Sequence, residues 1–481
     1  MAPFSRTAQN SRHRVAGRDP ECVIGPRVTV MTSTALLTDM YELTMVRAAL
    51  HSGTASRHVL FELFPRRLPT GRGYGVVAGT GRMLEALRDF RFGDAEIDYL
   101  LKAQVADDAL AEFLSGFRFG GDMVGYPEGE LYFGGSPLLQ VEGSFAEVVV
   151  LETALLSIYN HDSAIASAAS RMTMAAEGRP ILEFGARRTH EESAVAAARA
   201  AYIAGFGATS DLEAGRRFGL PVSGTAAHAF VMLFDTEEEA FKAQLDWLGE
   251  DTTLLVDTYD VEQAIRTAVR LTDGKLGGVR IDSGDLSTEV RQVRAQLDAL
   301  GATQTRIIVT NDLDEYQIAA LRAAPVDGFG VGTALVTGSG HPTCGFVYKM
   351  VAKASSDEPG APMHAVAKKS ANKNTIGGRK FALRRIDERG IAQAEVIGVD
   401  LAPRADSNDR SLLTDLVKGG QIVGDEPIQV ARERHERVRA ELPMNGRHLA
   451  NAEPAIPTLI LDEAGRPTDN VYQVGPAPTN L

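Results

Sequence analysis

The sequence predicts an α/β protein built around a parallel sheet or barrel. From about residue 180, strand-like runs alternate with helical stretches at the spacing typical of such sheets. The alternation stops after residue 345, and a chain of 481 residues is too long for one ordinary core, so two or three domains are expected. A large open sheet is the competing architecture, because about six strand–helix units do not prove closure.

The first part of the chain mixes helices and strands. Thr38 or Asp39 precedes regular apolar spacing, which predicts a helix start within residues 33–50. The sequence then predicts strands at 58–65 and 130–142 and helices at 146–158 and 191–204.

The repeating region is defined by where its strand-like runs stop. These runs end near Phe184, Thr225, Val256, Ile281, Val309 and Val331. Helices are predicted between them at 236–248, 260–271, 287–299 and 314–323. Beyond the repeats we expect a strand at 346–353, a charged helix at 427–442, and a Pro-rich, irregular stretch over the last thirty residues.

Composition excludes several classes of protein. A net charge of −13 argues against nucleic acid or an anionic membrane as the main partner. Cys22 and Cys344 are the two cysteines, too few for a Cys-rich zinc site or a disulfide framework, and they suit a reducing cytoplasm. No apolar run is long enough to span a bilayer. Residues 1–30 carry arginines without an apolar core, so we expect a disordered tail.

Three successive strands of the repeating region end in carboxylates. These are Asp257, Asp282 and Asp312. Carboxylates at the C-terminal edge of a parallel sheet can accept hydrogen bonds from sugar hydroxyls or hold Mg²⁺. Each of them alone could instead be a helix N-cap, but three caps at equivalent places are a less economical explanation.

Two further segments carry groups suited to a planar anionic ligand. Phe184 ends a strand just before Arg187, which suits a flat ring next to a phosphate, although a core phenylalanine and a solvated arginine are the alternative. His228 lies among small residues and could be a general base, a nucleophile or a metal ligand, or a packed structural histidine.

Residues 327–333 place three glycines at a late strand end, where backbone N–H groups can approach a phosphate. The chain has no G-x-x-x-x-G-K-[ST] loop, no complete dinucleotide fingerprint and no zinc-ligand spacing. Any ATP must therefore bind by other means.

Taken together, these segments resemble nicotinate phosphoribosyltransferase, a type II phosphoribosyltransferase family. The resemblance runs from about Leu36 to Lys380. Eight segments carry it in order: residues 36–45, 183–188, 224–228, 256–260, 280–284, 311–315, 330–333 and 347–349.

The resemblance implies a cytoplasmic enzyme of NAD salvage. It would join nicotinate to 5-phosphoribosyl 1-diphosphate, giving nicotinate mononucleotide and diphosphate, with ATP hydrolysis coupled through a phosphohistidine and Mg²⁺ as cofactor. The implied fold is an irregular TIM-like barrel at 151–345 beside a sandwich-like α/β domain built from 31–150 and 346–481. A homodimer with shared active sites is implied as well.

The resemblance also implies roles for single residues. His228 matches the histidine that ATP phosphorylates. Tyr41 and Phe184 match the aromatic groups that sandwich the pyridine ring, with Tyr41 supplied by the partner subunit. Thr225 and Arg280 match residues near the nicotinate carboxylate.

The implied ribose, phosphate and diphosphate contacts are Arg187, Asp257, Asp282, Asp312, Gly330, Gly332, Thr333 and Lys349. Asp282 and Asp312 would hold the ribose hydroxyls, and Asp257 would take a ribose or metal role. The glycines and Thr333 would cradle the 5′-phosphate. Mg²⁺ is expected to enter mainly with the diphosphate rather than on dedicated protein ligands.

One sequence position distinguishes enzymes that use the acid, nicotinate, from those that use the amide, nicotinamide. The relative that uses nicotinamide carries an aspartate there, and this chain has Ser210 in the preferred alignment, although a one-residue slip would bring Asp211 to it. An aspartate beside a nicotinate carboxylate would be repulsive. The alternatives are nicotinamide use, quinolinate use and a non-catalytic sensor of pyridine nucleotides. The basic loop 368–380 is either a solvated surface or an aid to ATP or diphosphate binding.

Overall fold

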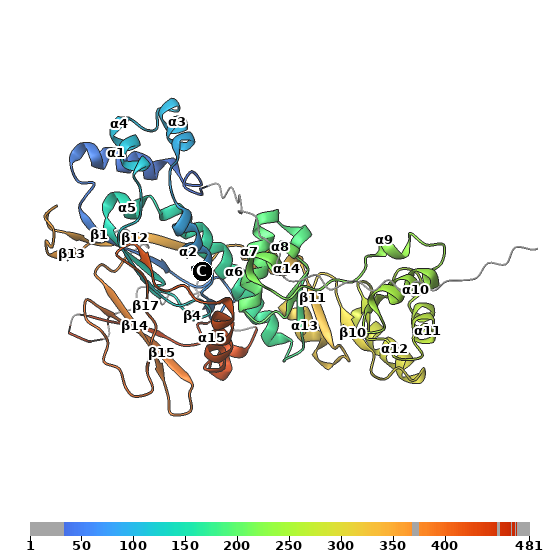
Figure 1. Cartoon of the computed structure of the whole chain (residues 1–481). Helices are drawn as coiled ribbons and strands as arrows, with labels where there is room; N and C mark the ends of the chain where they lie inside the picture. Colours follow the sequence, from blue (N-terminus) through green and yellow to red (C-terminus); the bar gives the residue numbers. More distant parts are fainter. Residues whose placement is uncertain (1–32, 368–374, 450–452, 463, 467, 469–481) are drawn as a thin grey trace, which may run out of the picture.

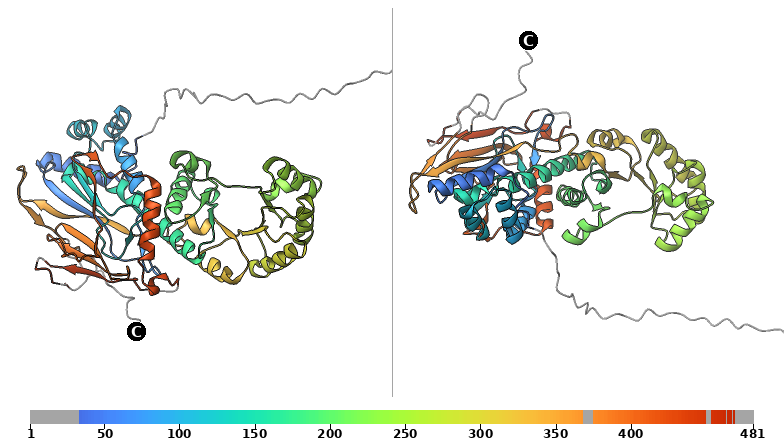
Figure 2. Two further views of the ribbon diagram at one scale, coloured as in Figure 1. Left: turned by 60° about the horizontal axis from the view of Figure 1, so that its bottom comes forward. Right: turned by 90° about the horizontal axis from the view of Figure 1, so that it is seen from above.

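The computed structural model describes residues 33–367, 375–449, 453–462, 464–466 and 468 (Figure 1). The described chain has a strand-rich unit and a half-barrel that lie side by side (Figures 1 and 2). The expected tail at 1–30 lies outside these residues, as does the middle of the basic loop, 368–374.

The strand-rich unit contains a seven-stranded sheet with strands from both ends of the chain. Its order is β13-β12-β1-β5-β3-β17-β18. The strands are β1 (His58–Pro65), β3 (Asp122–Gly125), β5 (Leu139–Ser144), β12 (Phe346–Ala354), β13 (Met363–Ala365), β17 (Thr414–Lys418) and β18 (Gln421–Ile422). The predicted strands at 58–65 and 346–353 are confirmed, and β1 lies between β12 and β5, antiparallel to both.

Two smaller sheets complete this unit. They are formed by β2 (Gly75–Val76), β4 (Leu131–Tyr132), β14 (Lys380–Ile386), β15 (Ala392–Val399), β16 (Arg410–Ser411) and β19 (Thr458–Leu461). The prediction that the last thirty residues are irregular is wrong in part, because they contain β19, which pairs parallel to β15. Pro457 stands just before β19, a position where the missing N–H does not interrupt a strand.

Helices cover the strand-rich unit and connect it to the half-barrel. They are α1 (Met40–Ser52), α2 (Thr80–Asp89), α3 (Asp94–Lys102), α4 (Asp108–Ser115), α5 (Phe145–Val149), α6 (Glu152–Ala175), α15 (Ile428–Ala440) and the 3₁₀ turn η3 (Met444–Arg447). The predicted helix at 146–158 is two helices, because the chain bends at residues 150–151 before α6 begins.

The half-barrel is a curled sheet of six parallel strands in the order β7-β6-β11-β10-β9-β8. They are β6 (Ile181–Glu183), β7 (Ala208–Thr209), β8 (Thr253–Leu255), β9 (Gly278–Ile281), β10 (Arg306–Val309) and β11 (Gly328–Val331). The order is circular except that β7 and β8 do not pair, so the predicted irregular barrel is confirmed as one that is open on one side.

Helices follow the strands and lie on the outside of the curled sheet (Figure 2). They are η1 (Ala186–Arg188), α7 (Glu191–Ile203), α8 (Leu212–Phe218), α9 (His228–Val231), α10 (Glu237–Leu248), α11 (Val261–Leu271), α12 (Leu286–Ala299), α13 (Glu315–Ala320), η2 (Leu321–Ala323) and α14 (Thr333–Val336).

The strand predicted to end near Thr225 is wrong. Only one bridge forms there, between Thr209 and Val222, and the following residues run as a loop to α9. Residues 223–227 are Ser-Gly-Thr-Ala-Ala, which are small and lack the large side chains that favour a pleated, half-buried strand. The loop lies on the open side of the sheet, and it carries Thr225 to the start of α9.

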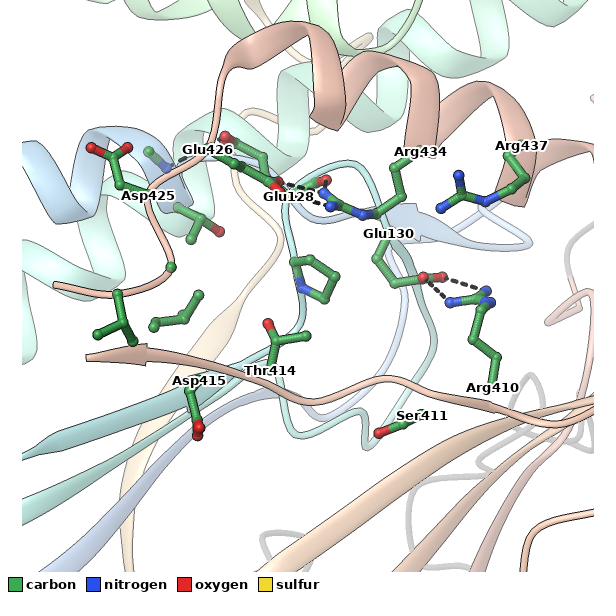
Figure 3. Close-up of a pocket in the computed structure, with 16 residues that line it drawn as sticks. Glu128, Glu130, Arg410, Ser411, Thr414, Asp415, Asp425, Glu426, Arg434 and Arg437 are labelled. Carbon is green, nitrogen blue, oxygen red and sulfur yellow. Dashed lines mark hydrogen bonds and ion pairs between the residues drawn. The ribbon is translucent and has the colours of Figure 1, made fainter. Parts of the chain in front are cut away.

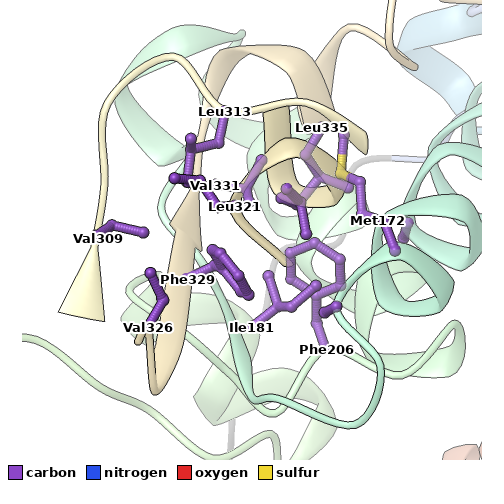
Figure 4. Packing of buried hydrophobic residues seen from close by; sticks show 14 of the residues in the cluster. Met172, Ile181, Phe206, Val309, Leu313, Leu321, Val326, Phe329, Val331 and Leu335 are labelled. Atoms are coloured by element: carbon purple, nitrogen blue, oxygen red, sulfur yellow. The ribbon is translucent and has the colours of Figure 1, made fainter. Parts of the chain in front are cut away.

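The half-barrel core is formed by side chains from the sheet, from the helices packed on it and from α6. Ile181, Phe206, Phe329 and Met172 pack together below the ends of the strands (Figure 4). Each is no more than 1% exposed, and burying one such side chain contributes about 2 kcal/mol. This packing holds the backbone of β6 and β11 in place beneath the loops that follow them.

The long helix α6 links the two units. Its 24 residues span about 36 Å. Ser163 and Ser167 accept hydrogen bonds from the backbone of Ala78 and Val76 in the strand-rich unit. Arg171 of the same helix donates to Glu315 of α13 at 3.0 Å, and both side chains are buried. Within the described part of the chain, none of the helices combines the length and apolar composition that a bilayer crossing needs.

Candidate active site

The loops after the six parallel strands carry most of the predicted site residues. Because parallel strands share one direction, their carboxyl ends meet at the same edge of the sheet. Phe184 and Arg187 follow β6, Ser210 follows β7, and Asp257 follows β8. Arg280 lies in β9. The remaining rim residues are Asp282, Asp312, Gly330, Gly332 and Thr333, and His228 begins α9.

Three of these loops contain a second aspartate that caps the following helix. Asp260 accepts a hydrogen bond from Gln263 N at 2.8 Å at the start of α11. Asp285 accepts from Ser287 N at 3.2 Å at the start of α12. Asp314 accepts from two backbone N–H groups, both at 2.9 Å, at the start of α13. The capping explanation for Asp257, Asp282 and Asp312 is therefore wrong, because other aspartates occupy those positions.

Asp257 connects two neighbouring loops. One carboxylate oxygen lies 3.2 Å from His228 Nε2. The other accepts from the backbone N of Asp282 at 2.8 Å and from the hydroxyl of Ser283 at 2.7 Å. The Asp257 side chain is 2% exposed, whereas that of His228 is 36% exposed. A buried acceptor on Nε2 orients the imidazole and leaves Nδ1 for an incoming group.

Arg280 and Asp282 form the next part of the rim. Thr310 Oγ1 donates to Asp282 Oδ1. Arg280 Nη2 lies 3.8 Å from Asp282 Oδ2, and Arg280 Nη1 donates to the carbonyl of Ala226 at 3.4 Å. The buried Nε of Arg280 has no hydrogen-bond partner among the described atoms. The guanidinium therefore has one unpaired donor, and that donor is buried.

Asp312 projects from a turn in an uncommon backbone conformation. Asn311 has φ of +109°, and its side chain accepts from the backbone N of Asp312 at 2.9 Å. Both residues are exposed. A non-glycine residue in this region of φ is costly and is often found at ligand-binding sites. The turn presents the Asp312 carboxylate to solvent above β10.

Phe184 is held against the glycine-rich strand β11. A Cβ on Gly330 would lie 2.7 Å from the Phe184 ring and 2.5 Å from the Thr310 methyl group. Gly330 is fully buried within β11, so its expected role as a phosphate contact stays a prediction, and its observed role is to make room for Phe184. Gly332 and Thr333 lie further along, at the exposed start of α14.

Ser210 and Asp211 differ in what their side chains already bind. Asp211 accepts from Ala214 N at 2.8 Å and caps α8. Ser210 is exposed, and its backbone N donates to the carbonyl of Glu183 at 2.9 Å. The serine hydroxyl is therefore the more available of the two side chains.

Tyr41 and Lys349 do not lie with the rim residues of the same chain. They belong to α1 and β12 in the strand-rich unit, and both views place α1 on the opposite side from β8–β10 (Figures 1 and 2). Lys349 Nζ is 3.8 Å from Glu152 Oε1. Partial burial and the neighbouring Glu152 charge raise the pKa of Tyr41. These two residues thus form a separate cluster around one carboxylate.

A cavity of about 350 Å³ lies elsewhere in the strand-rich unit (Figure 3). Its charged lining is largely paired: Arg434 binds Glu426, and Arg410 binds Glu130. The predicted site residues do not line it.

The described residues contain no group of three His, Cys, Asp or Glu side chains arranged to hold a metal ion. Both oxygens of Asp257, the candidate protein ligand for Mg²⁺, already accept hydrogen bonds. The exposed carboxylate of Asp312 and the free side of Asp282 remain as oxygen donors of the kind Mg²⁺ prefers. The residues present thus fit a cation that arrives with a phosphate ligand.

Sequence reasoning missed two members of the site, Thr310 and Glu183. Thr310 donates to Asp282, and its methyl group lies next to Gly330, as the Phe184 ring does. Its position directly after β10 could have identified it from the sequence. Glu183 is the last residue of β6 and is 1% exposed. An acid at the end of an apolar run, next to a predicted ligand-stacking ring, was the signal there.

Comparisons with known proteins agree with this geometry. A family model described as the nicotinate phosphoribosyltransferase (NAPRTase) N-terminal domain matches residues 36–160, and one described as the nicotinate phosphoribosyltransferase (NAPRTase) family matches residues 180–380. Nicotinate phosphoribosyltransferase pncB1 of Mycobacterium tuberculosis is 56% identical over 432 residues, which cover 88% of this chain and 94% of the relative. Nicotinate phosphoribosyltransferase of Bacillus subtilis is 40% identical, with 74% of each chain covered.

Solved structures show the same fold. Human nicotinic acid phosphoribosyltransferase superposes with a TM-score of 0.75 at 26% identity, covering 89% of this chain and 98% of the human one. Nicotinate-nucleotide pyrophosphorylase from Pyrococcus furiosus superposes with a TM-score of 0.68 at 24% identity, covering 85% and 96%, which shows the fold alone.

The division between capping and rim aspartates predicts unequal effects on stability. Asp314→Ala removes the acceptor for two backbone N–H groups and should lower the free energy of unfolding by about 1 kcal/mol. Asp312→Ala removes an exposed carboxylate and should change it by less than about 0.5 kcal/mol. Urea unfolding followed by circular dichroism measures both. Equal losses would mean that Asp312 is structural.

Proposed function

The chain belongs to the nicotinate phosphoribosyltransferase family, and from this premise we propose how its residues carry out the transfer. Its substrates, nicotinate and 5-phosphoribosyl 1-diphosphate, follow from the family, and its place is NAD salvage. The ring nitrogen of nicotinate attacks C1 of the ribose, and the bond from C1 to the diphosphate oxygen breaks. The products are nicotinate mononucleotide and diphosphate.

The observation that carries the mechanism is the set of rim carboxylates that are not used as helix caps. Positive charge builds on the sugar ring as diphosphate leaves. We assign Asp282 and Asp312 to the ribose hydroxyls. Fixed carboxylates there stabilise the developing charge, and each lowers the barrier by about 3 kcal/mol. We place the 5′-phosphate at Gly332 and Thr333. Arg187 contacts the phosphate groups together with Lys349 of the partner subunit. Bound Mg²⁺ would neutralise charge on the departing diphosphate.

His228 is the residue we propose for ATP coupling. Nε2 faces the buried Asp257 carboxylate, and in the tautomer that donates there, Nδ1 carries the lone pair. Nδ1 attacks the γ-phosphorus of ATP, the bond to ADP breaks, and a phosphohistidine forms. Hydrolysis of that phosphohistidine then releases phosphate. Asp257 also accepts from the backbone N of Asp282, so the carboxylate that orients His228 also anchors the ribose loop.

The base pocket favours an acid over an amide. Phe184 stacks on the pyridine ring, while Arg280, Thr225 and Ser210 receive its carboxylate. The planar guanidinium of Arg280, whose Nε is unpaired, suits a planar anion. The nicotinamide alternative needs an aspartate facing the ring substituent, but the Asp211 carboxylate is occupied at the N-terminus of α8. Quinolinate would need a further cluster of cations, and Arg280 is the one rim cation that contacts this pocket in our assignment.

We also propose that the enzyme acts as a cytoplasmic homodimer with shared active sites. Tyr41 and Lys349 belong to α1 and β12, which lie well apart from β10 and α9 of the half-barrel (Figures 1 and 2). Exposed apolar side chains are near Tyr41 in the sequence, with Leu37 71% and Met40 61% exposed. Leu233, close to α9, is 76% exposed. Contact between two copies would cover both apolar surfaces and bring Tyr41 of the partner subunit to the face of the ring opposite Phe184.

The assay that tests the proposed function combines purified protein, nicotinate, 5-phosphoribosyl 1-diphosphate, ATP and Mg²⁺. We expect nicotinate mononucleotide, and Asp282→Asn should lower kcat/KM by about 100-fold. Asp285→Asn is the matched control, because asparagine caps a helix as well as aspartate does, and activity should be unchanged. Consumption of nicotinamide in place of nicotinate would overturn the assignment, and phosphate incorporation that persists in His228→Ala would remove His228 from it.

Shared active sites predict that two inactive variants restore each other. Tyr41→Ala and His228→Ala should each show little ATP-coupled activity alone. After mixing and subunit exchange, one site of each mixed dimer contains both native residues. About a quarter of wild-type activity should return, because half of the dimers are mixed and each has one intact site. Activity that never rises above the sum of the separate variants would mean that each site is built from one chain.

A further inference from the structure

Glu183 is a buried carboxylate for which the mechanism above has no use. It is the last residue of β6 and is 1% exposed. One oxygen accepts a hydrogen bond from Gly185 N, and the other accepts from Thr209 Oγ1. No ion pair to Glu183 occurs within the portion of the chain that the structure covers. Burial, with a smaller contribution from Asp211, raises the pKa of Glu183.

The hydrogen bond from Gly185 N to Glu183 fixes Phe184, the residue proposed to stack on the pyridine ring. Phe184 lies between Glu183 and Gly185, so the bond from the Glu183 carboxylate to Gly185 N closes a tight turn around it. Phe184 N donates to Val331 O at 2.8 Å, and its ring lies against Gly330. Gly185 is itself closely packed, since a Cβ there would lie 2.3 Å from Val336. The Phe184 side chain therefore has little conformational freedom while the bond between Glu183 and Gly185 N is intact.

The second bond fixes the loop after β7, which carries Ser210 to the carboxylate side of the proposed base pocket. Thr209 Oγ1, which donates to Glu183, also accepts from Asp211 N at 2.9 Å. Ser210 lies between these two residues, and its own N donates to the Glu183 carbonyl at 2.9 Å. Both backbone neighbours of Ser210 and its own amide are thus tied, directly or through one hydroxyl, to Glu183. One side chain spans the two loops that carry Phe184 and Ser210.

We propose that Glu183 is a positioning residue that holds Phe184 and Ser210 at one separation and thereby sets the affinity of the base pocket for a pyridine carboxylate. This inference rests on the proposed function, because it takes Phe184 and Ser210 to be the walls of that pocket. A hydrogen-bonded side chain is suited to the task, because each bond has a preferred length and direction, whereas an apolar side chain could shift between rotamers.

Variants at Glu183 distinguish a role in positioning Phe184 and Ser210 from a role in fold stability alone. Glu183→Ala removes both acceptors and should raise KM for nicotinate by about tenfold, while KM for 5-phosphoribosyl 1-diphosphate changes less than about twofold. Glu183→Gln should be intermediate, because its carbonyl can still accept from Gly185 N and its NH₂ can donate to Thr209 Oγ1. Thr209→Val, which keeps the shape and removes the hydroxyl, should change the KM for nicotinate in the same direction.

Asp327→Asn is the matched control. Asp327 accepts from Ile307 N at 2.7 Å at the opposite end of the same sheet, and the substitution should leave both KM values unchanged. Parallel increases in both KM values, or a fall in kcat alone, would show that Glu183 only stabilises the fold. If Glu183→Ala does not fold, an unchanged KM for nicotinate in Thr209→Val overturns the inference.

Failure of the Glu183 inference can be distinguished from failure of the proposed function. A wild-type protein that consumes nicotinamide contradicts the proposed function. In that case the same selective rise in KM for nicotinamide in Glu183→Ala still supports Glu183 as the positioning residue, and an unchanged value contradicts it.

Discussion

The first turn of each half-barrel helix leaves backbone N–H groups without intrahelical partners, and satisfying them is the constraint on which the site depends. Asp260, Asp285 and Asp314 meet this need at three successive helices. The loops are thereby fixed at one end, and the aspartate at the other end of each is left for another role. Asp211 meets the same need at α8, which leaves Ser210 available.

The predicted site residues are divided between the half-barrel and the strand-rich unit. The half-barrel is open where β7 and β8 do not pair, and the rim residues Ser210, Asp312 and Thr333 are exposed. The strand-rich unit carries Tyr41 and Lys349 around Glu152 on a distant surface. In the proposed dimer, association with a second copy would bring Tyr41 and Lys349 to the rim of the partner's half-barrel.

The sequence was sufficient for the elements with strong local signals. β1, α7 and the four later strands of the half-barrel follow from apolar runs and capping residues. The sequence could not show that residues 223–227 make only a loop, because that depends on the missing partner for β7. It also could not distinguish a capping aspartate from a rim aspartate, since the two are three or fewer positions apart and differ only in which N–H groups they reach. The position of Glu183 at the end of an apolar run was visible in the sequence, but its bond to Thr209, 26 residues away, was not.

The central claim is that rim and capping groups are distinct, and a crystal structure with bound nicotinate mononucleotide tests it most directly. The account predicts the ribose hydroxyls within hydrogen-bond distance of Asp282 and Asp312, the carboxylate of the base at Arg280 and Ser210, and Asp211 still bonded at the start of α8. Asp211 turned away from α8 toward the base, or a ribose bound without contact to Asp282 and Asp312, would contradict it.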